Sequence, residues 1–160
     1  MNGFLSYAHD DASEFRAFRT HLAALKRGFG LALWTDHRIT AGTQWESAIA
    51  EAIAKAQVFV LLLSPSFIAS DYVFEKELPA IIDRRKSAAA LVLPVLVKRC
   101  MWEWLVGQLQ AVPTTDEGRL RPITEWRPQD HGCDRATRQM AAAIEKHFGT
   151  APSRIDLGVA

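Results

Sequence analysis

Six apolar residues follow one another without alternation in the stretch Val58-Phe59-Val60-Leu61-Leu62-Leu63, and Ser64-Pro65 comes directly after them. A strand with one face in water alternates apolar and polar side chains, whereas a strand covered on both faces does not. The stretch therefore predicts a central strand of a parallel sheet with a helical layer on each side. It is far too short to cross a membrane.

Shorter apolar runs on either side of this stretch predict the other strands. We expect them at residues 4–7, 31–35 and 91–97, with a short fifth strand at Arg121 to Thr124. Pro94 falls inside the fourth run, and proline cannot donate a hydrogen bond to a neighbouring strand. We therefore expect that strand to be interrupted or to lie near an edge of the sheet.

Segments with the apolar periodicity of a helix lie between these runs. Apolar side chains recur every three or four positions in the first helix, which we expect from Ala12 to Arg27 and ended by Gly28 and Gly30. Further helices are expected at residues 45–56, 72–86 (with Ser70 as N-cap) and 134–148, and a short amphipathic segment at 101–109. Strands that alternate with helices predict an α/β fold, a parallel sheet flanked by helices on both faces.

Size and charge narrow the class of protein. A chain of 160 residues with 49% hydrophobic residues suits one globular domain with a sizeable core. Its net charge of +1 gives no general attraction to nucleic acid or anionic membranes. Cys100 and Cys133 are far apart in the sequence and belong to no CxxC pair, and Met1-Asn2-Gly3 runs directly into a strand without a signal region. We expect a cytoplasmic domain with two free thiols.

The order of elements also predicts where a ligand binds. In open parallel sheets, ligands bind beyond the carboxyl ends of the strands, where the strand order reverses. That rule points to Tyr7 to Asp11, Thr35 to Gly42 and Ser64 to Glu77.

At these three places the chain resembles TIR (Toll/interleukin-1 receptor) domains of the bacterial kind. The resemblance rests on these segments in this order: Phe4-Leu5-Ser6-Tyr7-Ala8-His9-Asp10-Asp11; Trp34-Thr35-Asp36 with Ile39, Gly42, Trp45 and Ile49; Val60-Leu61-Leu62-Leu63-Ser64-Pro65-Ser66-Phe67 with Ser70-Asp71-Tyr72 and Glu77; and Leu93-Pro94-Val95-Leu96 with Trp102. It spans about residues 3–148.

The resemblance implies a flavodoxin-like sheet of about five parallel strands in a domain of residues 1–149. Residues 150–160 would then be a tail or the start of a linker to a sensor domain. Some TIR domains are scaffolds that bind other TIR domains, and others cleave the bond between nicotinamide and ribose in NAD⁺. In the enzymes a glutamate on the helix after the third strand is indispensable, and that position falls on Glu77.

The resemblance and the ligand rule together give a candidate site in which NAD⁺ is the substrate and neither a cofactor nor a metal is expected. The expected substrate-binding residues are Tyr7, Ala8, His9, Trp34, Thr40, Trp45 and Tyr72. A self-association loop containing Asp36, Ile39 and Gly42 would join copies into a homo-oligomer.

The chemistry of the reaction explains these residue types. Loss of nicotinamide leaves an oxocarbenium-like ribose, which a neighbouring carboxylate can stabilise. Nicotinamide attached to ribose is already a cationic leaving group, so no general acid is needed. An aromatic side chain would attract the pyridinium ring. The diphosphate needs N–H donors, for which the Ala8–Asp11 turn and the Ser70 cap are candidates.

Two points stay open at the level of sequence. Glu75 and Glu77 lie about 200° apart on a helix, so only one of them can face the site, and Pro79 invites a kink close to both. The function is also open. We expect an NAD⁺ glycohydrolase that acts as a bacterial antiphage immune effector activated by self-association, with ADP-ribose or a cyclic form of it as the product. The alternative is a non-enzymatic TIR–TIR interaction and signalling module.

Overall fold

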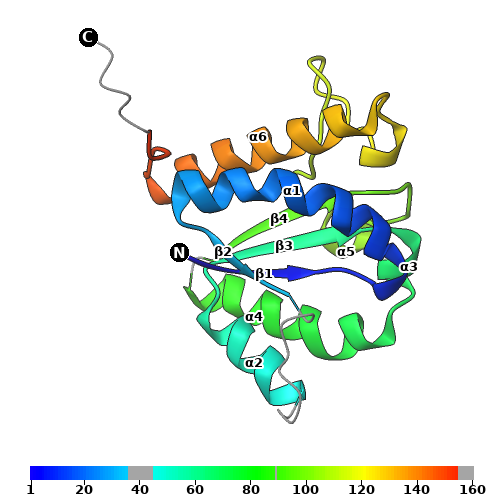
Figure 1. Cartoon of the computed structure of the whole chain (residues 1–160). Coiled ribbons are helices and arrows are strands. Elements are labelled where there is room, and N and C mark those ends of the chain that lie inside the picture. Colours follow the sequence, from blue (N-terminus) through cyan, green and yellow to red (C-terminus); the bar gives the residue numbers. More distant parts are fainter. Residues whose placement is uncertain (36–44, 89, 155–160) are drawn as a thin grey trace.

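The computed structural model describes residues 1–35, 45–88 and 90–154, and they form a three-layered α/β arrangement (Figure 1). The strands are β1 (Asn2–Ser6), β2 (Ala32–Trp34), β3 (Val58–Leu63) and β4 (Leu91–Leu96). They pair in the order β2-β1-β3-β4, and every pair is parallel. The strand order reverses between β1 and β3, because the chain leaves β1 towards β2 and then returns to the other side of β1.

Helices cover both faces of the sheet (Figure 1). The longer ones are α1 (Ala12–Phe29), α2 (Trp45–Lys55), α4 (Leu78–Ala88) and α6 (Gln129–Phe148). Short helical segments are η1 (His9–Asp11), α3 (Pro65–Ile68), η3 (Val73–Glu77), α5 (Glu103–Val106) and η4 (Ile123–Glu125). Helices α1 and α6 lie on one face, and α2 and α4 lie on the other. The predicted α/β class with a flanked parallel sheet is confirmed.

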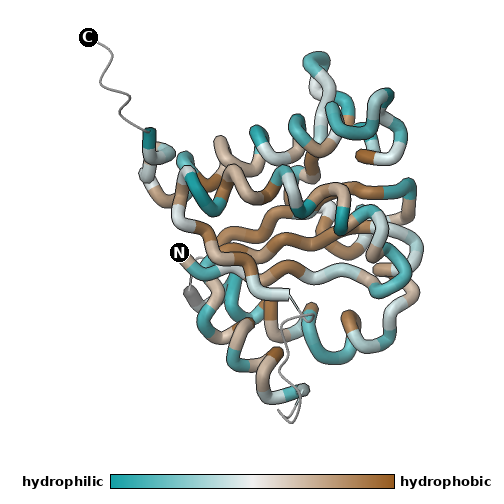
Figure 2. Tube along the Cα trace, viewed as in Figure 1, coloured by the Kyte–Doolittle hydropathy of each residue, from teal (hydrophilic) through white to brown (hydrophobic). Residues whose placement is uncertain are grey.

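β3 supplies both halves of the core, as its unbroken apolar run predicts. Val58, Val60 and Leu62 pack in one cluster with the apolar side chains of α1 and α6. Phe59, Leu61 and Leu63 pack in the other cluster with those of α2 and α4. All six side chains are at most 1% exposed. Figure 2 shows the hydrophobic strands between helices in which hydrophilic and hydrophobic residues alternate along the chain.

Among the residues that the structure describes, the sheet has four strands where about five were expected, and the prediction of a strand at Arg121 to Thr124 is wrong. That segment contributes to the short helical turn η4, and the Thr124 N–H donates to the Val97 carbonyl (3.1 Å). Where a fifth strand would pair with β4, the described residues form only one parallel bridge, between Val95 and Val112. Pro113 follows at once and has no N–H, so the pairing does not extend into a strand.

β4 runs through Pro94 without a break and is one of the two edge strands of the sheet, so the predicted edge position is correct. The Pro94 carbonyl accepts a hydrogen bond from the Val112 N–H (3.0 Å).

The boundaries of α1 and α6 differ from those expected. Gly28 lies within α1, and only Gly30, with φ of 65°, ends the helix. α6 begins five residues earlier than the expected start at Asp134. Among the described residues, no helix is both long and apolar enough to span a membrane.

Candidate functional site

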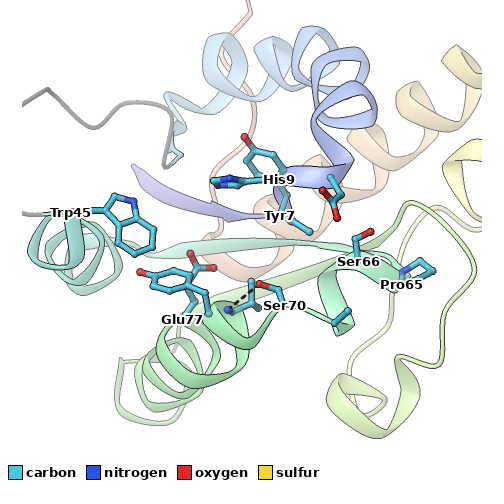
Figure 3. Close-up of a pocket in the computed structure, with 12 residues that line it drawn as sticks. Tyr7, His9, Trp45, Pro65, Ser66, Ser70 and Glu77 are labelled. Atoms are coloured by element: carbon cyan, nitrogen blue, oxygen red, sulfur yellow. Dashed lines mark hydrogen bonds between the residues drawn. The ribbon is translucent and has the colours of Figure 1, made fainter.

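A pocket of about 540 Å³ opens at the carboxyl ends of β1 and β3, where the strand order reverses. Its lining residues are Tyr7, Ala8, His9, Asp10, Trp45, Pro65, Ser66, Ala69, Ser70, Tyr72, Val73 and Glu77. Figure 3 shows the Glu77 carboxylate pointing into the space between Trp45 and His9. The segments after β1 and β3 and the start of α2 therefore converge on one space, as the ligand rule for parallel sheets predicts.

Glu77 is a buried carboxylate on the wall of this pocket. Glu77 is 6% exposed, and Ser6 Oγ donates a hydrogen bond to Glu77 Oε2. Ser6 is the last residue of β1 and is itself 2% exposed. A buried carboxylate needs hydrogen-bond donors to offset the loss of water. The serine supplies one of them and fixes the direction of the carboxylate.

Glu77, and not Glu75, faces the pocket. Glu75 is exposed and does not line the pocket, whereas Glu77 does. This geometry removes the ambiguity that the sequence leaves between the two glutamates.

The helix that carries Glu77 contains a wide turn. It runs from Asp71 to Ala88, and within it η3 is a π-helical turn, in which the Leu78 N–H donates to the Val73 carbonyl. Pro79 lies two residues after the end of this turn. The disturbance that Pro79 predicts is therefore a π-turn around Glu77.

Ser70 begins this helix, as predicted. Its Oγ accepts a hydrogen bond from the Val73 N–H (3.4 Å). The Val73 amide is therefore already occupied, as is the Asp11 amide, which donates to the Ala8 carbonyl (2.9 Å). These two amides lie in the two segments that were expected to bind the diphosphate. In this conformation neither amide can donate a hydrogen bond to a ligand.

An aromatic pair forms the wall next to Glu77. The ring centroids of Trp45 and Tyr72 lie 4.4 Å apart with an interplanar angle of 37°. Trp45, the first residue of α2, is 41% exposed, so much of its indole is open to a ligand. Tyr72 is half-buried and holds the indole in place by this contact.

The segment after β1 forms the opposite wall. Tyr7 is buried and stacks on Phe15 of α1, with ring centroids 4.5 Å apart. His9 is exposed at the edge of the pocket, and Ala8 is buried between the two. Tyr7 therefore links the pocket to the α1 layer of the core.

Trp34 does not line the pocket, although it was predicted from the sequence to bind substrate. Its ring stacks on Phe4 at 5.4 Å between centroids, and it packs against the core cluster on the α2 and α4 side. Thr40 and the expected loop residues Asp36, Ile39 and Gly42 lie outside the described residues.

An ionic cluster centred on the buried Asp11 lies beside the pocket and was not predicted from the sequence. Asp11 is fully buried and accepts hydrogen bonds from Ser64 Oγ and from Lys98 Nζ (2.8 Å). Lys98 also pairs with Glu14 at 3.0 Å. Ser64 Oγ in turn accepts from the Phe67 N–H (2.9 Å), which caps α3. The cluster ties together the segments that follow β1, β3 and β4.

The charges of this cluster stabilise each other. The hydrogen bond to Asp11 raises the pKa of Lys98 above its ordinary value of 10.5 and outweighs the opposing effect of burial. Burial by itself raises the pKa of Glu14, but hydrogen bonds with Ser13 and Lys98 outweigh it and hold this pKa below 4.5. The position of Lys98 just after a predicted strand is the signal that could have pointed to this cluster.

Comparison with known proteins agrees with the fold. The TIR domain family matches residues 4–125. The protein y4lF of Sinorhizobium fredii (strain NBRC 101917 / NGR234), which is uncharacterised, is 32% identical over 155 residues, which cover 94% of this chain and 47% of the relative. The chain thus spans about half the length of this curated relative.

A solved structure has the same fold. The TIR domain of the Toll-related receptor TRR-2 from Hydra magnipapillata superposes with a TM-score of 0.54 and 17% sequence identity, over 72% of this chain and 85% of that one.

Proposed function

Since the chain belongs to the TIR domain family, we propose that it is an NAD⁺ glycohydrolase that releases nicotinamide and gives ADP-ribose or a cyclic form of it. The observation that carries the proposal is the placement of Glu77. It is a buried carboxylate on the wall of a pocket at the switch point of the sheet, and Ser6 orients it. Buried carboxylates that line a pocket are uncommon outside functional sites.

The proposed reaction breaks the bond between the ribose anomeric carbon and the pyridinium nitrogen. The electron pair of that bond passes to nicotinamide, which leaves as a neutral molecule and needs no proton. Positive charge develops on the ribose, and the Glu77 carboxylate stabilises it at close range. Water then bonds to the anomeric carbon and loses a proton to solvent. In the cyclising reaction, a nucleophile of the same substrate takes the place of water.

Trp45 and Tyr72 supply the aromatic side of the proposed site. A pyridinium ring lying on the open face of Trp45 gains about 0.5–2 kcal/mol from its attraction to the indole, with the higher value in a desolvated setting. The contact of Tyr72 with the indole limits the motion of Trp45 before substrate arrives. Less entropy is then lost when the substrate binds.

Direct assay tests the proposal. The chain is incubated with NAD⁺ at low and at very high protein concentration, and chromatography follows nicotinamide and its co-product. We expect nicotinamide in equal amount to ADP-ribose or its cyclic form, and more turnover per chain at the higher concentration if the site is completed by self-association. A folded sample that releases no nicotinamide at either concentration would contradict the enzymatic function.

A second function, the recruitment of other copies of the domain, has its own supporting observation. Met101 and Trp104 are 75% and 59% exposed, and Ile82 of α4 is 39% exposed. Trp104 also stacks on Phe74, with centroids 5.7 Å apart. Large apolar side chains in water favour a protein interface. Sedimentation of the native chain and of Trp104→Lys tests this function, because the variant should self-associate less if the surface is used.

A further inference from the structure

Tyr72 and Glu77 both line the pocket although five positions separate them in one helix. In a regular α-helix each residue turns by about 100°, so residues five apart point about 140° away from each other. A regular helix over this segment could present either side chain to the pocket but not both.

The π-turn of η3 removes this conflict. The Leu78 N–H bonds to the carbonyl of Val73, five residues earlier, instead of the carbonyl four residues earlier. A turn closed by such a bond contains about one residue more than an α-helical turn, so residues five apart stand nearly above one another. The wide turn therefore brings Tyr72 and Glu77 onto the same face.

Pro79 is the residue that disfavours the regular alternative. In an α-helix the N–H of residue 79 would bond to the Glu75 carbonyl, but proline has no N–H and its ring collides with that carbonyl. The regular turn is therefore costly at this place. Pro79 itself is exposed, so its ring contributes little to the packing of the core.

The flanking residues hold the two ends of the wide turn. Val73 on one side and Leu78 and Ile81 on the other are buried at 3%, 3% and 1% exposure. A change from the wide to the regular turn would rotate one end relative to the other by the equivalent of one residue. Glu77 lies between these two ends, so its direction depends on which turn forms.

We propose that Pro79 is a positioning residue for the pocket. It maintains the π-turn that presents Glu77 beside Tyr72 and within reach of the Ser6 hydroxyl. Its effect on turnover rests on the proposed NAD⁺ cleavage, whereas its effect on the turn does not. Pro79 acts through Glu77 and does not itself line the pocket.

The test is Pro79→Ala in the full chain. The alanine restores an N–H and a good helix former, so we expect the variant to melt at the same temperature or higher. We expect its kcat to fall roughly 10- to 100-fold, because a displacement of about 1 Å in a catalytic group has effects of that size. KM should change less, because Trp45 still binds the nicotinamide end. A structural role alone would lower stability and activity together.

Two further measurements complete the test. A crystal structure of Pro79→Ala should show a regular turn, in which the Leu78 N–H bonds to the Phe74 carbonyl, four residues earlier, and no longer to the Val73 carbonyl. Combining Pro79→Ala with Glu77→Gln should reduce turnover no further than Glu77→Gln alone, because both changes remove the same group. Asp83→Ala, at an exposed position of the same helix, is the matched control and should leave kcat unchanged.

The outcomes separate the two proposals. If the structure of Pro79→Ala keeps the bond from the Leu78 N–H to the Val73 carbonyl, or shows the regular turn together with full turnover, Pro79 does not position Glu77. If the unsubstituted chain turns over no NAD⁺, the proposed function fails, and the crystal structure of Pro79→Ala alone still decides whether Pro79 maintains the wide turn.

Discussion

Glu77 owes its place in the pocket to a partner 71 positions away in the sequence. Ser6 is the last residue of β1. Its hydroxyl donates a hydrogen bond to the carboxylate of Glu77, which lies on the helical segment that follows β3. Sequence alone could indicate Glu77 through family resemblance, but it could not indicate this serine as its partner. The partnership depends on the register of β1 against β3, which is a tertiary property.

Removing this hydroxyl should weaken the site. We expect Ser6→Ala to lower kcat roughly tenfold, because a hydrogen bond to a charged group contributes about 1.5–3 kcal/mol and part of it serves to orient the carboxylate. Steady-state kinetics with NAD⁺ measures the effect. Ser87→Ala removes an exposed serine hydroxyl from α4 and should leave kcat unchanged. Equal kcat values for all three proteins would show that Ser6 has no part in the reaction.

Lys98 should matter for stability more than any exposed lysine. Replacing it by methionine leaves Asp11 buried without its cation, and we expect the free energy of unfolding to fall by about 3 kcal/mol. This is the low end for a buried pair, because the Lys98 side chain is 35% exposed. Lys55→Met is the control, since its pair with Glu51 lies in water and should contribute about 0.5 kcal/mol or less. Urea unfolding that gives equal losses for both variants would contradict the role of the cluster.

The pH dependence of this effect follows from the two pKa shifts. The pKa of Lys98 is raised, so its contribution to stability is complete below 10.5 and is lost as the pH rises through the raised value. The pKa of Glu14 is lowered, so its contribution is complete above 4.5 and is lost as the pH falls through the lowered value. The stability difference between the native chain and Lys98→Met should therefore stay constant between pH 4.5 and 10.5 and shrink outside that window.

At the scale of secondary-structure elements, β3 joins the two layers of the core. We expect Leu62→Ala to lower the free energy of unfolding by about 2–5 kcal/mol, the range for a fully buried leucine in a packed core. Ile82→Ala, at a 39% exposed position of α4, should cost about 1 kcal/mol or less. Urea unfolding measures both variants. Similar losses in the free energy of unfolding would mean that β3 contributes no more to the core than an exposed helix position does.

The elements show where sequence patterns succeed and where they fail. The four strands are marked by apolar runs and the long helices by apolar residues every three or four positions, and the structure contains all of them. The early start of α6 places Gly132 inside the helix and against Trp126, six residues earlier. Gly132 is unfavourable in a helix, yet a side chain there would come within 2.7 Å of the Trp126 ring. Only glycine lets that ring pack against the helix, and local sequence does not reveal such a contact.

Across the whole molecule, strand order predicted the pocket better than the aromatic residues did. Every lining residue except Trp45 lies within residues 7–11 or 64–77, the segments that follow β1 and β3. Trp34 also comes at a strand end, but its strand is an edge strand one position away from the switch point, and its ring stacks on Phe4. The sequence also did not predict the wide turn around Glu77. Pro79 indicates that the helix is disturbed there, but not that the disturbance is a π-turn.

One comparison tests the central proposal, that Glu77 is the catalytic carboxylate of an NAD⁺ glycohydrolase, most directly. Glu77→Gln and Glu75→Gln make the same chemical change two positions apart on one helix. Glu77 is buried and lines the pocket, whereas Glu75 is exposed and does not. We expect the release of nicotinamide from NAD⁺ to fall at least about 100-fold in Glu77→Gln, as when one group that stabilises developing charge is removed, and to stay at the native rate in Glu75→Gln. Native turnover in a folded Glu77→Gln protein would contradict the proposal.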